Sequence, residues 1–168
     1  MHKKLLIIRH AQAEELGNSS MLRDFDRDLT SKGISQSARL GSFLFQKSYK
    51  IDHMVCSPAN RTFETAKVIW EQLKGDVDLI EKDTELYGGG ARAYLHCLNQ
   101  VSDNVDVLAI VGHNPDITFF AEYLTRDDIK GSMKKCTLVE IDFEGLSWAE
   151  ISGNTGKMIQ RIDPEDLS

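Results

Sequence analysis

Short runs of apolar residues mark the predicted strands of this chain. The run Leu5–Ile8 is continuous, and the run Val105–Val111 is interrupted only by Asp106. Such runs are typical of central strands that are covered on both faces of a sheet. The shorter runs 54–56 and 77–80 are two further strand candidates.

Between these runs, apolar residues recur at the spacing of a helix. Residues 63–73 and 117–124 carry apolar side chains at positions i, i+3, i+4 and i+7, which predicts two helices with one buried face each. A third helix is expected to begin after Thr30, a residue type that caps helices, and a weaker helical pattern follows the triple glycine 88–90. Strand and helix periods therefore alternate along the chain.

Near the end of the chain the pattern changes to a strict alternation. Val139, Ile141 and Phe143 alternate with acidic residues, and a Glu-Gly turn then leads into Trp148–Ile151, which together predict a hairpin. The whole pattern predicts an α/β fold, a three-layer α/β/α sandwich with a mostly parallel sheet and antiparallel strands late in the chain. We expect one domain over residues 1–168, with a loosely specified tail from about residue 153.

Composition and charge limit the binding partners and the cellular compartment that we expect for this protein. The formal net charge of −6 makes nucleic acid or an anionic membrane an unfavourable partner, because the overall field repels polyanions. No apolar stretch is long enough to span a bilayer, and the opening apolar run is too short for a signal peptide. The three cysteines follow neither a disulfide framework nor a zinc spacing. We therefore expect a cytoplasmic protein with no metal and no cofactor.

Polar and basic residues follow three of the predicted strands. Arg9-His10 ends the first strand, 56–61 (Cys-Ser-Pro-Ala-Asn-Arg) ends the second, and 112–115 (Gly-His-Asn-Pro) ends a later one. In open parallel sheets, ligands bind beyond the carboxyl ends of the strands. These three segments are therefore expected to meet at one site.

Two of these segments also carry helix-start signals. Ser57 and Asn114 are candidate N-caps, each followed by a proline at the first helical position, so that free backbone N–H groups would face the crevice. Arg61 would lie one turn into its helix, with its side chain directed back toward the same crevice. Two arginines, two histidines and two helix starts together favour a site for a phosphate dianion.

The sequence resembles the histidine phosphatase superfamily, which has the phosphoglycerate-mutase-like fold, and within it the short phosphohistidine phosphatase branch named SixA. The resemblance covers nearly the whole chain. It rests on five segments in the same order, at 6–11, 24–33, 57–66, 85–86 and 111–115.

This resemblance implies a role for each residue at the strand ends. His10 would be the residue that becomes phosphorylated, Arg9 and Arg61 would hold the phosphoryl oxygens, and His113 would be the second histidine facing it. Neutral His10 would attack phosphorus, while its other ring nitrogen donates to a backbone carbonyl. Three further residues are candidates for substrate contacts at the entrance, namely Arg27, Gln12 and Asn114.

The chain departs from the family pattern at two places. Ala11 replaces the usual glycine after Arg-His, and no acidic residue stands where larger members carry a general acid. Asn114 follows the second histidine, Gly88 aligns with the usual glutamate, and Glu85 lies three residues too early. Because the imidazole of phosphohistidine leaves more readily than an alkoxide, the missing acid favours a P–N bond as the substrate. The predicted partner is a phosphorylated protein, such as a histidine phosphotransfer domain or a phosphocarrier protein.

Other interpretations of the sequence stay open. Cys56 to Arg61 resembles the loop of cysteine phosphatases, although one residue is missing from the spacing. A phosphoglycerate mutase is disfavoured, because no large insertion could form a lid over a sugar phosphate. A small-molecule phosphomonoesterase of the same superfamily and a non-catalytic phosphohistidine-binding module are the remaining alternatives.

Overall fold

A single mixed sheet organises the residues that the computed structural model describes, which are 1–17 and 23–167. Its strands lie in the order β3-β2-β4-β1-β5-β6. In chain order they are β1 (His2–Arg9), β2 (His53–Cys56), β3 (Glu81–Lys82), β4 (Val107–Gly112), β5 (Leu138–Glu144) and β6 (Lys157–Ile162). Strands β3, β2, β4 and β1 are parallel to one another. β5 is antiparallel to β1, and β6 is antiparallel to β5. The predicted mostly parallel sheet with late antiparallel strands is confirmed.

The register brings the carboxyl ends of three strands together. Arg9 at the end of β1 pairs with Gly112 at the end of β4, and Cys56 at the end of β2 pairs with Val111. The segments that follow these strands therefore start from the same edge of the sheet, as expected for ligand sites in parallel sheets.

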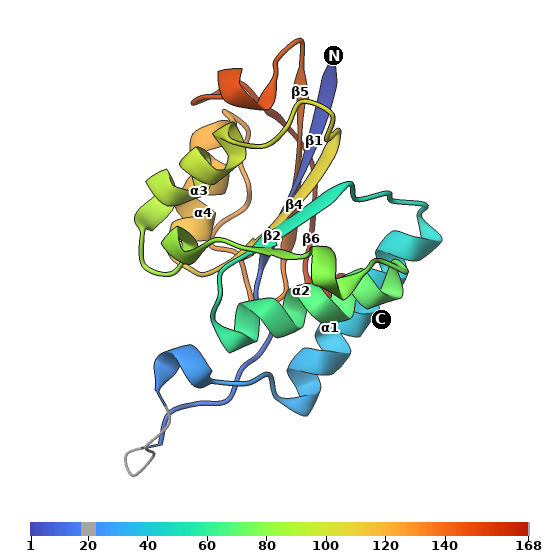
Figure 1. Ribbon diagram of the computed structural model, residues 1–168, viewed down its shortest axis with the longest axis vertical. Helices are drawn as coiled ribbons and strands as arrows, with labels where there is room; N and C mark the ends of the chain where they lie inside the picture. Colours follow the sequence, from blue (N-terminus) through green and yellow to red (C-terminus); the bar gives the residue numbers. More distant parts are fainter. Residues whose placement is uncertain (18–22, 168) are drawn as a thin grey trace.

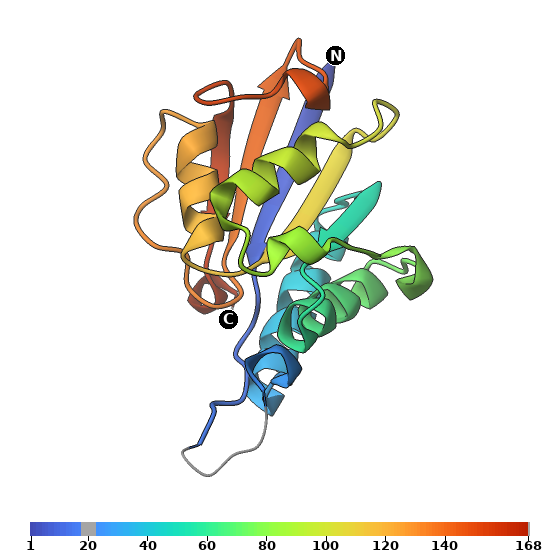
Figure 2. The same ribbon diagram turned by 60° about the vertical axis from the view of Figure 1, so that its left-hand side comes forward.

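Helices cover both faces of the sheet (Figures 1 and 2). α1 (Ser31–Gln46) and α2 (Asn60–Gln72) lie on one face, and α3 (Gly90–Asn99) and α4 (Asp116–Leu124) lie on the other. Within β1, Leu6 and Ile8 pack in the core under α1 and α2, whereas Leu5 and Ile7 pack in the core under α3 and α4. Successive side chains of a strand point to opposite faces of the sheet. This arrangement confirms the three-layer α/β/α sandwich.

Residues 77–80, predicted as a strand, are instead mostly a turn. Val77–Leu79 form a 3₁₀ helix, and the short edge strand β3 follows it. The carboxylate of Asp76 accepts a hydrogen bond from the backbone N–H of Asp78, which stabilises the tight turn. The local cap therefore outweighs the β propensity of these apolar residues.

The predicted late hairpin is wrong in its second strand. Trp148–Glu150 form a 3₁₀ helix, and the fully buried Trp148 donates from its indole nitrogen to the carbonyl oxygen of Val105 at 2.7 Å. Burial of this large side chain, and not pairing with β5, decides where the segment lies. The partner of β5 is β6, in the region after residue 153 that we expected to be loosely specified. Its backbone hydrogen bonds with β5 give this tail the order that its polar sequence does not indicate.

Candidate functional site

His10 and His113 face each other at the strand ends. Their ring centroids lie 5.5 Å apart with an interplanar angle of 60°. His10 follows β1 and His113 follows β4, and their exposed fractions are only 7% and 9%. Arg9 and the buried Arg61 are close enough for their charges to lower the pKa of both imidazoles. The structure therefore brings together the four residues that the sequence singled out.

The ring of His10 is held by the backbone of the next residue. Its Nδ1 lies 2.7 Å from the carbonyl oxygen of Ala11, which can only accept a hydrogen bond. Nδ1 therefore carries the hydrogen, and the lone pair is on Nε2, as expected from the sequence. Burial, and secondarily the charges of His113, Arg61 and Arg9, lower the pKa of His10 to about 3. The ring is thus neutral and nucleophilic at physiological pH.

His113 is positioned by two hydroxyl groups. Its Nε2 lies 2.8 Å from the Oγ of Ser57, and its backbone N–H donates to the hydroxyl of Tyr94 at 3.0 Å. The Oγ of Ser57 also accepts from the N–H of Ala59 at 3.4 Å, and we assign its hydroxyl hydrogen to the Nε2 of His113. Burial first, and then the charge of Arg61, lower the pKa of His113 to about 4. In this arrangement the hydrogen of the neutral ring is on Nδ1.

Three buried nitrogens at the site have no partner within the protein. Among the described residues, the buried side-chain polar atoms without a hydrogen bond are the Nε atoms of Arg9 and Arg61 and the Nδ1 of His113. A buried donor without a partner costs about 1–3 kcal/mol, so such atoms are rare unless a ligand satisfies them. They come from β1, from α2 and from the segment that follows β4. They are suited to an anion with several acceptor oxygens, such as a phosphoryl group.

Asp24 and Tyr87 complete the surroundings of Arg61. The guanidinium of Arg61 donates from one NH₂ group to the backbone oxygen of Asp24 at 2.8 Å and from the other to its carboxylate at 3.0 Å. The hydroxyl of Tyr87 donates to the same carboxylate at 2.7 Å, and its ring packs edge-on against His113 with centroids 5.6 Å apart. These contacts orient the Nε edge of Arg61.

The pKa of Asp24 decides whether this carboxyl group could act as a general acid. Burial raises the pKa of its carboxyl, but hydrogen bonds from Tyr87 and Arg27 and the charge of Arg61 outweigh burial and lower it to about 2. The carboxylate is therefore ionised at neutral pH and has no proton to donate. The sequence placed Asp24 only within a family motif, and Tyr87 carried no signal because it lies in an irregular loop.

The three candidates for substrate contacts, Arg27, Gln12 and Asn114, have different settings. Arg27 donates to the carboxylate of Asp24 at 2.9 Å, and the amide oxygen of Gln12 accepts from the hydroxyl of Thr30 at 2.8 Å. The amide nitrogen of Asn114 donates to the hydroxyl of Ser132 and to the backbone oxygen of Met133. Its amide oxygen accepts from the hydroxyl of Thr118. Asn114 thus holds the 132–133 loop. A direct contact with substrate stays a prediction for all three residues.

The predicted N-caps of the two site helices are wrong. α2 begins at Asn60 and α4 begins at Asp116, and neither Ser57 nor Asn114 occupies the cap position. Both side chains instead bond residues that are distant in the chain, since Ser57 bonds the imidazole of His113 and Asn114 bonds the backbone of Met133. By contrast, the predicted cap Thr30 is confirmed, since its Oγ1 accepts from the N–H of Gly33.

The cysteine-phosphatase interpretation is not supported by the environment of Cys56. The thiol is fully buried in β2, and burial raises its pKa to about 12, so that it stays protonated and unreactive. Glu85, the displaced acid candidate, is exposed in the 3₁₀ helix Thr84–Leu86. Tyr87 is the residue of this loop that contacts His113.

The described part of the chain offers neither a clustered metal site nor a membrane span. Within residues 1–17 and 23–167, no group of three or more His, Cys, Asp or Glu side chains could hold a metal ion. None of the helices in these residues is long and apolar enough to cross a membrane.

Comparison with known proteins shows which family and which solved structures this chain is similar to. Residues 5–93 match the model of the histidine phosphatase superfamily (branch 1). A SixA structure from Nakamurella multipartitia superposes with a TM-score of 0.80 at 25% identity, covering 98% of this chain and 97% of that one. The structure of the protein histidine phosphatase SixA complexed with tungstate superposes with a TM-score of 0.81 at 20% identity. The match covers 98% of this chain and 99% of that one. An uncharacterized chloroplastic protein of Arabidopsis thaliana is 25% identical over 177 residues, 99% of this chain and 79% of that protein.

The phosphoglycerate-mutase-like sandwich, with two facing histidines at its strand ends, is that of a phosphatase. The chain belongs to the histidine phosphatase superfamily, and its resemblance to the SixA branch is confirmed.

Proposed function

We propose that this protein is a metal-independent phosphatase that removes the phosphoryl group from phosphohistidine on a partner protein. The observation that carries the proposal is the set of three unpartnered buried donors, Arg9 Nε, Arg61 Nε and His113 Nδ1, around the neutral imidazole of His10. They supply hydrogen bonds where the oxygens of a transferring phosphoryl group develop charge.

The reaction proceeds in two displacements at phosphorus. In the first, the Nε2 lone pair of His10 attacks in line, a P–N bond to His10 forms, and the bond to the leaving group breaks. Arg9, Arg61 and His113 donate to the equatorial oxygens. In the second, water attacks the phosphohistidine of the enzyme, which releases inorganic phosphate and regenerates neutral His10.

The proton inventory of the site supports a P–N substrate. Asp24 is ionised, and the neighbouring histidines are both neutral at physiological pH. An alkoxide leaving group benefits about 10²–10⁴-fold from a general acid. The imidazole of a phosphohistidine can instead leave as a neutral ring once its distal nitrogen is protonated. A site without a poised acid is therefore best matched to a phosphoramidate.

We also propose that the protein acts in the cytoplasm. All three cysteines are buried free thiols, which suits a reducing compartment.

Trapping of the covalent intermediate tests the proposal. The protein is incubated with phosphohistidine proteins, phosphoserine peptides and sugar phosphates, then quenched in base. We expect an acid-labile, base-stable phosphoenzyme that forms fastest from phosphohistidine. It should be absent in His10→Ala and retained in His96→Ala, a matched change at an exposed histidine on α3.

The alternative functions give different results in the same assay. Faster turnover of phosphoserine or sugar phosphates would indicate a small-molecule or ester phosphatase and overturn the substrate assignment. Binding of phosphohistidine proteins without any phosphoenzyme would indicate a non-catalytic binding module. Loss of turnover after treatment with a chelator would contradict metal independence.

A further inference from the structure

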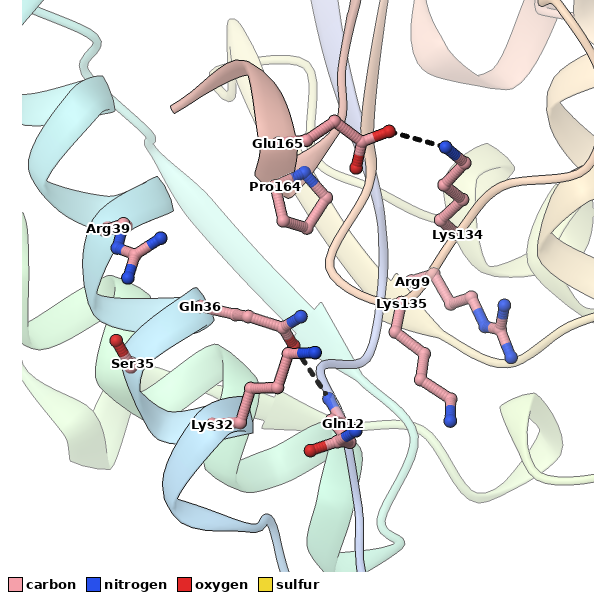
Figure 3. A pocket seen from close by; sticks show the side chains of 10 residues that line it. All are labelled: Arg9, Gln12, Lys32, Ser35, Gln36, Arg39, Lys134, Lys135, Pro164 and Glu165. Carbon is pink, nitrogen blue, oxygen red and sulfur yellow. Dashed lines mark hydrogen bonds and ion pairs between the residues drawn. The ribbon is translucent and has the colours of Figure 1, made fainter. Parts of the chain in front are cut away.

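A cavity of about 630 Å³ opens beside the candidate active site, on the side of Arg9 (Figure 3). Its walls are the N-terminal half of α1, the segment before β5, and the turn after β6. Because Arg9 lines this cavity and also lies next to His10, the cavity continues the site laterally. A substrate held at His10 would have this space beside it.

The lining of this cavity is strongly basic. We call it the basic groove and define it by five cations, Arg9, Lys32, Arg39, Lys134 and Lys135, against one carboxylate, that of Glu165. Glu165 pairs with Lys134 at 2.5 Å, and both side chains are 59% exposed. The groove therefore keeps a local excess of positive charge in a chain whose net charge is −6.

The cations on α1 lie along one face of the helix. Lys32, Gln36 and Arg39 are spaced i, i+4 and i+7, and all three line the cavity (Figure 3). Seven helical residues span about 10 Å, which is roughly the length of three residues of an extended peptide. The groove therefore offers contacts beyond a single phosphoryl group.

We propose that the basic groove binds acidic side chains that flank the phosphohistidine of a partner protein. This inference rests on the proposed function, because it assigns the groove to the same substrate. It adds a sequence preference, in which carboxylates next to the phosphohistidine contact Lys32, Arg39 and Lys135 while the phosphoryl group lies against Arg9.

The exposure of the cations favours a protein surface over a small polyphosphorylated ligand. Apart from the half-buried Arg9, all of them are exposed on long flexible side chains. Exposed cations that are spread over about 10 Å can each pair with a separate carboxylate, whereas one compact phosphate could contact only some of them. An acidic partner is repelled by most of this protein, so attraction at the groove also orients the encounter.

Kinetics with two matched peptides test this inference. One phosphohistidine peptide carries Glu and Asp beside the phosphohistidine, and the other carries Gln and Asn at the same positions. We expect kcat/KM of the full-length protein to be about 5-fold or more higher for the acidic peptide at low salt, and high salt should remove the preference. The double variant Lys32→Glu with Arg39→Glu should abolish or reverse the preference. Its turnover of a small phosphoramidate should be unchanged.

Two further variants make the result specific. Lys157→Glu reverses an exposed cation on β6, at the end of the sheet opposite Arg9, and should keep the preference. Glu165→Gln removes the carboxylate that neutralises Lys134 and should strengthen the preference. Thermal unfolding of each variant establishes that it is folded.

The outcomes separate the inference from the function on which it rests. An unchanged peptide preference in the double variant overturns the groove assignment, as does an equal loss with the small phosphoramidate. A loss confined to a bisphosphorylated small ester would also overturn it, in favour of a second phosphate site. If the wild-type protein hydrolyses neither phosphohistidine peptide but hydrolyses a phosphate ester, the proposed function itself fails.

Discussion

Single hydrogen bonds decide which nitrogen of each histidine is available for chemistry. The carbonyl of Ala11 fixes the hydrogen of His10 on Nδ1 and exposes the nucleophilic lone pair on Nε2. Ser57 does the opposite for His113, because its hydroxyl lies against Nε2 and leaves Nδ1 to donate. Two identical side chains thereby present different nitrogens, which suits the roles proposed for them, nucleophile for His10 and donor to the phosphoryl group for His113.

This assignment makes Ser57 a positioning residue that acts through His113. We expect Ser57→Ala to lower kcat/KM by about 10-fold, which corresponds to the loss of one hydrogen bond, and to change the tautomer of His113. Turnover kinetics measure the first effect, and ¹⁵N NMR of the imidazole measures the second. Ser102→Ala, at an exposed serine, is the control. An altered rate with an unchanged His113 spectrum would contradict this role.

At the scale of elements, the first helix is fastened to the segment that follows His10. The N-terminus of α1 is capped by Thr30, whose backbone N–H also donates to the carbonyl of Gln12 at 3.0 Å. Gly33 packs directly on the backbone of Gln12, where no Cβ could be accommodated. The close approach of helix and loop therefore positions the residues next to the nucleophile.

We expect Gly33→Ala to destabilise the protein although alanine favours helices. The added methyl group would overlap the backbone of Gln12, so that α1 and the loop must separate, at a cost of about 1–3 kcal/mol in the free energy of unfolding. Turnover should fall as well, because the loop directly follows His10. Urea unfolding measures the first effect. Ser35→Ala, an exposed change two residues along α1, should leave stability within about 0.5 kcal/mol. An equally stable Gly33→Ala would show that the contact is not tight.

At the scale of the whole molecule, folding places two titratable rings in a buried, positively charged site. The pKa values of His10 and His113 fall to about 3 and about 4, whereas both return to about 6.5 on unfolding. As the pH falls below about 6.5, the unfolded chain takes up protons that the folded protein does not. The free energy of unfolding must therefore decrease with falling pH.

The expected dependence is specific enough to measure. Between pH 6.5 and about 4, each of the two histidines should contribute a slope of up to about 1.4 kcal/mol per pH unit to the free energy of unfolding. His10→Gln should show a shallower slope over this range than the wild type, and His96→Gln, at an exposed position, should not. Denaturant unfolding at several pH values provides the measurement. Parallel pH profiles for the wild type and His10→Gln would contradict the lowered pKa.

Local sequence patterns are enough to predict the layers of this protein and the four residues at its centre. Buried strands and amphipathic helices have periods that are visible along the chain. Arg9, His10 and His113 stand at the end of a strand or directly after it, and Arg61 lies in the first turn of a helix. The carboxyl ends of parallel strands must share one edge of a sheet, so local position was enough to bring these residues together.

The side chains that contact these four residues, and the strand at the edge of the sheet, depend on the tertiary structure. Ser57, Asp24 and Tyr87 reach the site through contacts between segments far apart in the chain, and no local pattern marks such contacts. β6 was missed because an edge strand is ordered by backbone pairing with β5 and needs no apolar run. The basic groove likewise forms only where α1, the segment before β5 and the turn after β6 converge. Periodicity records what one segment buries, whereas these features depend on which segments meet.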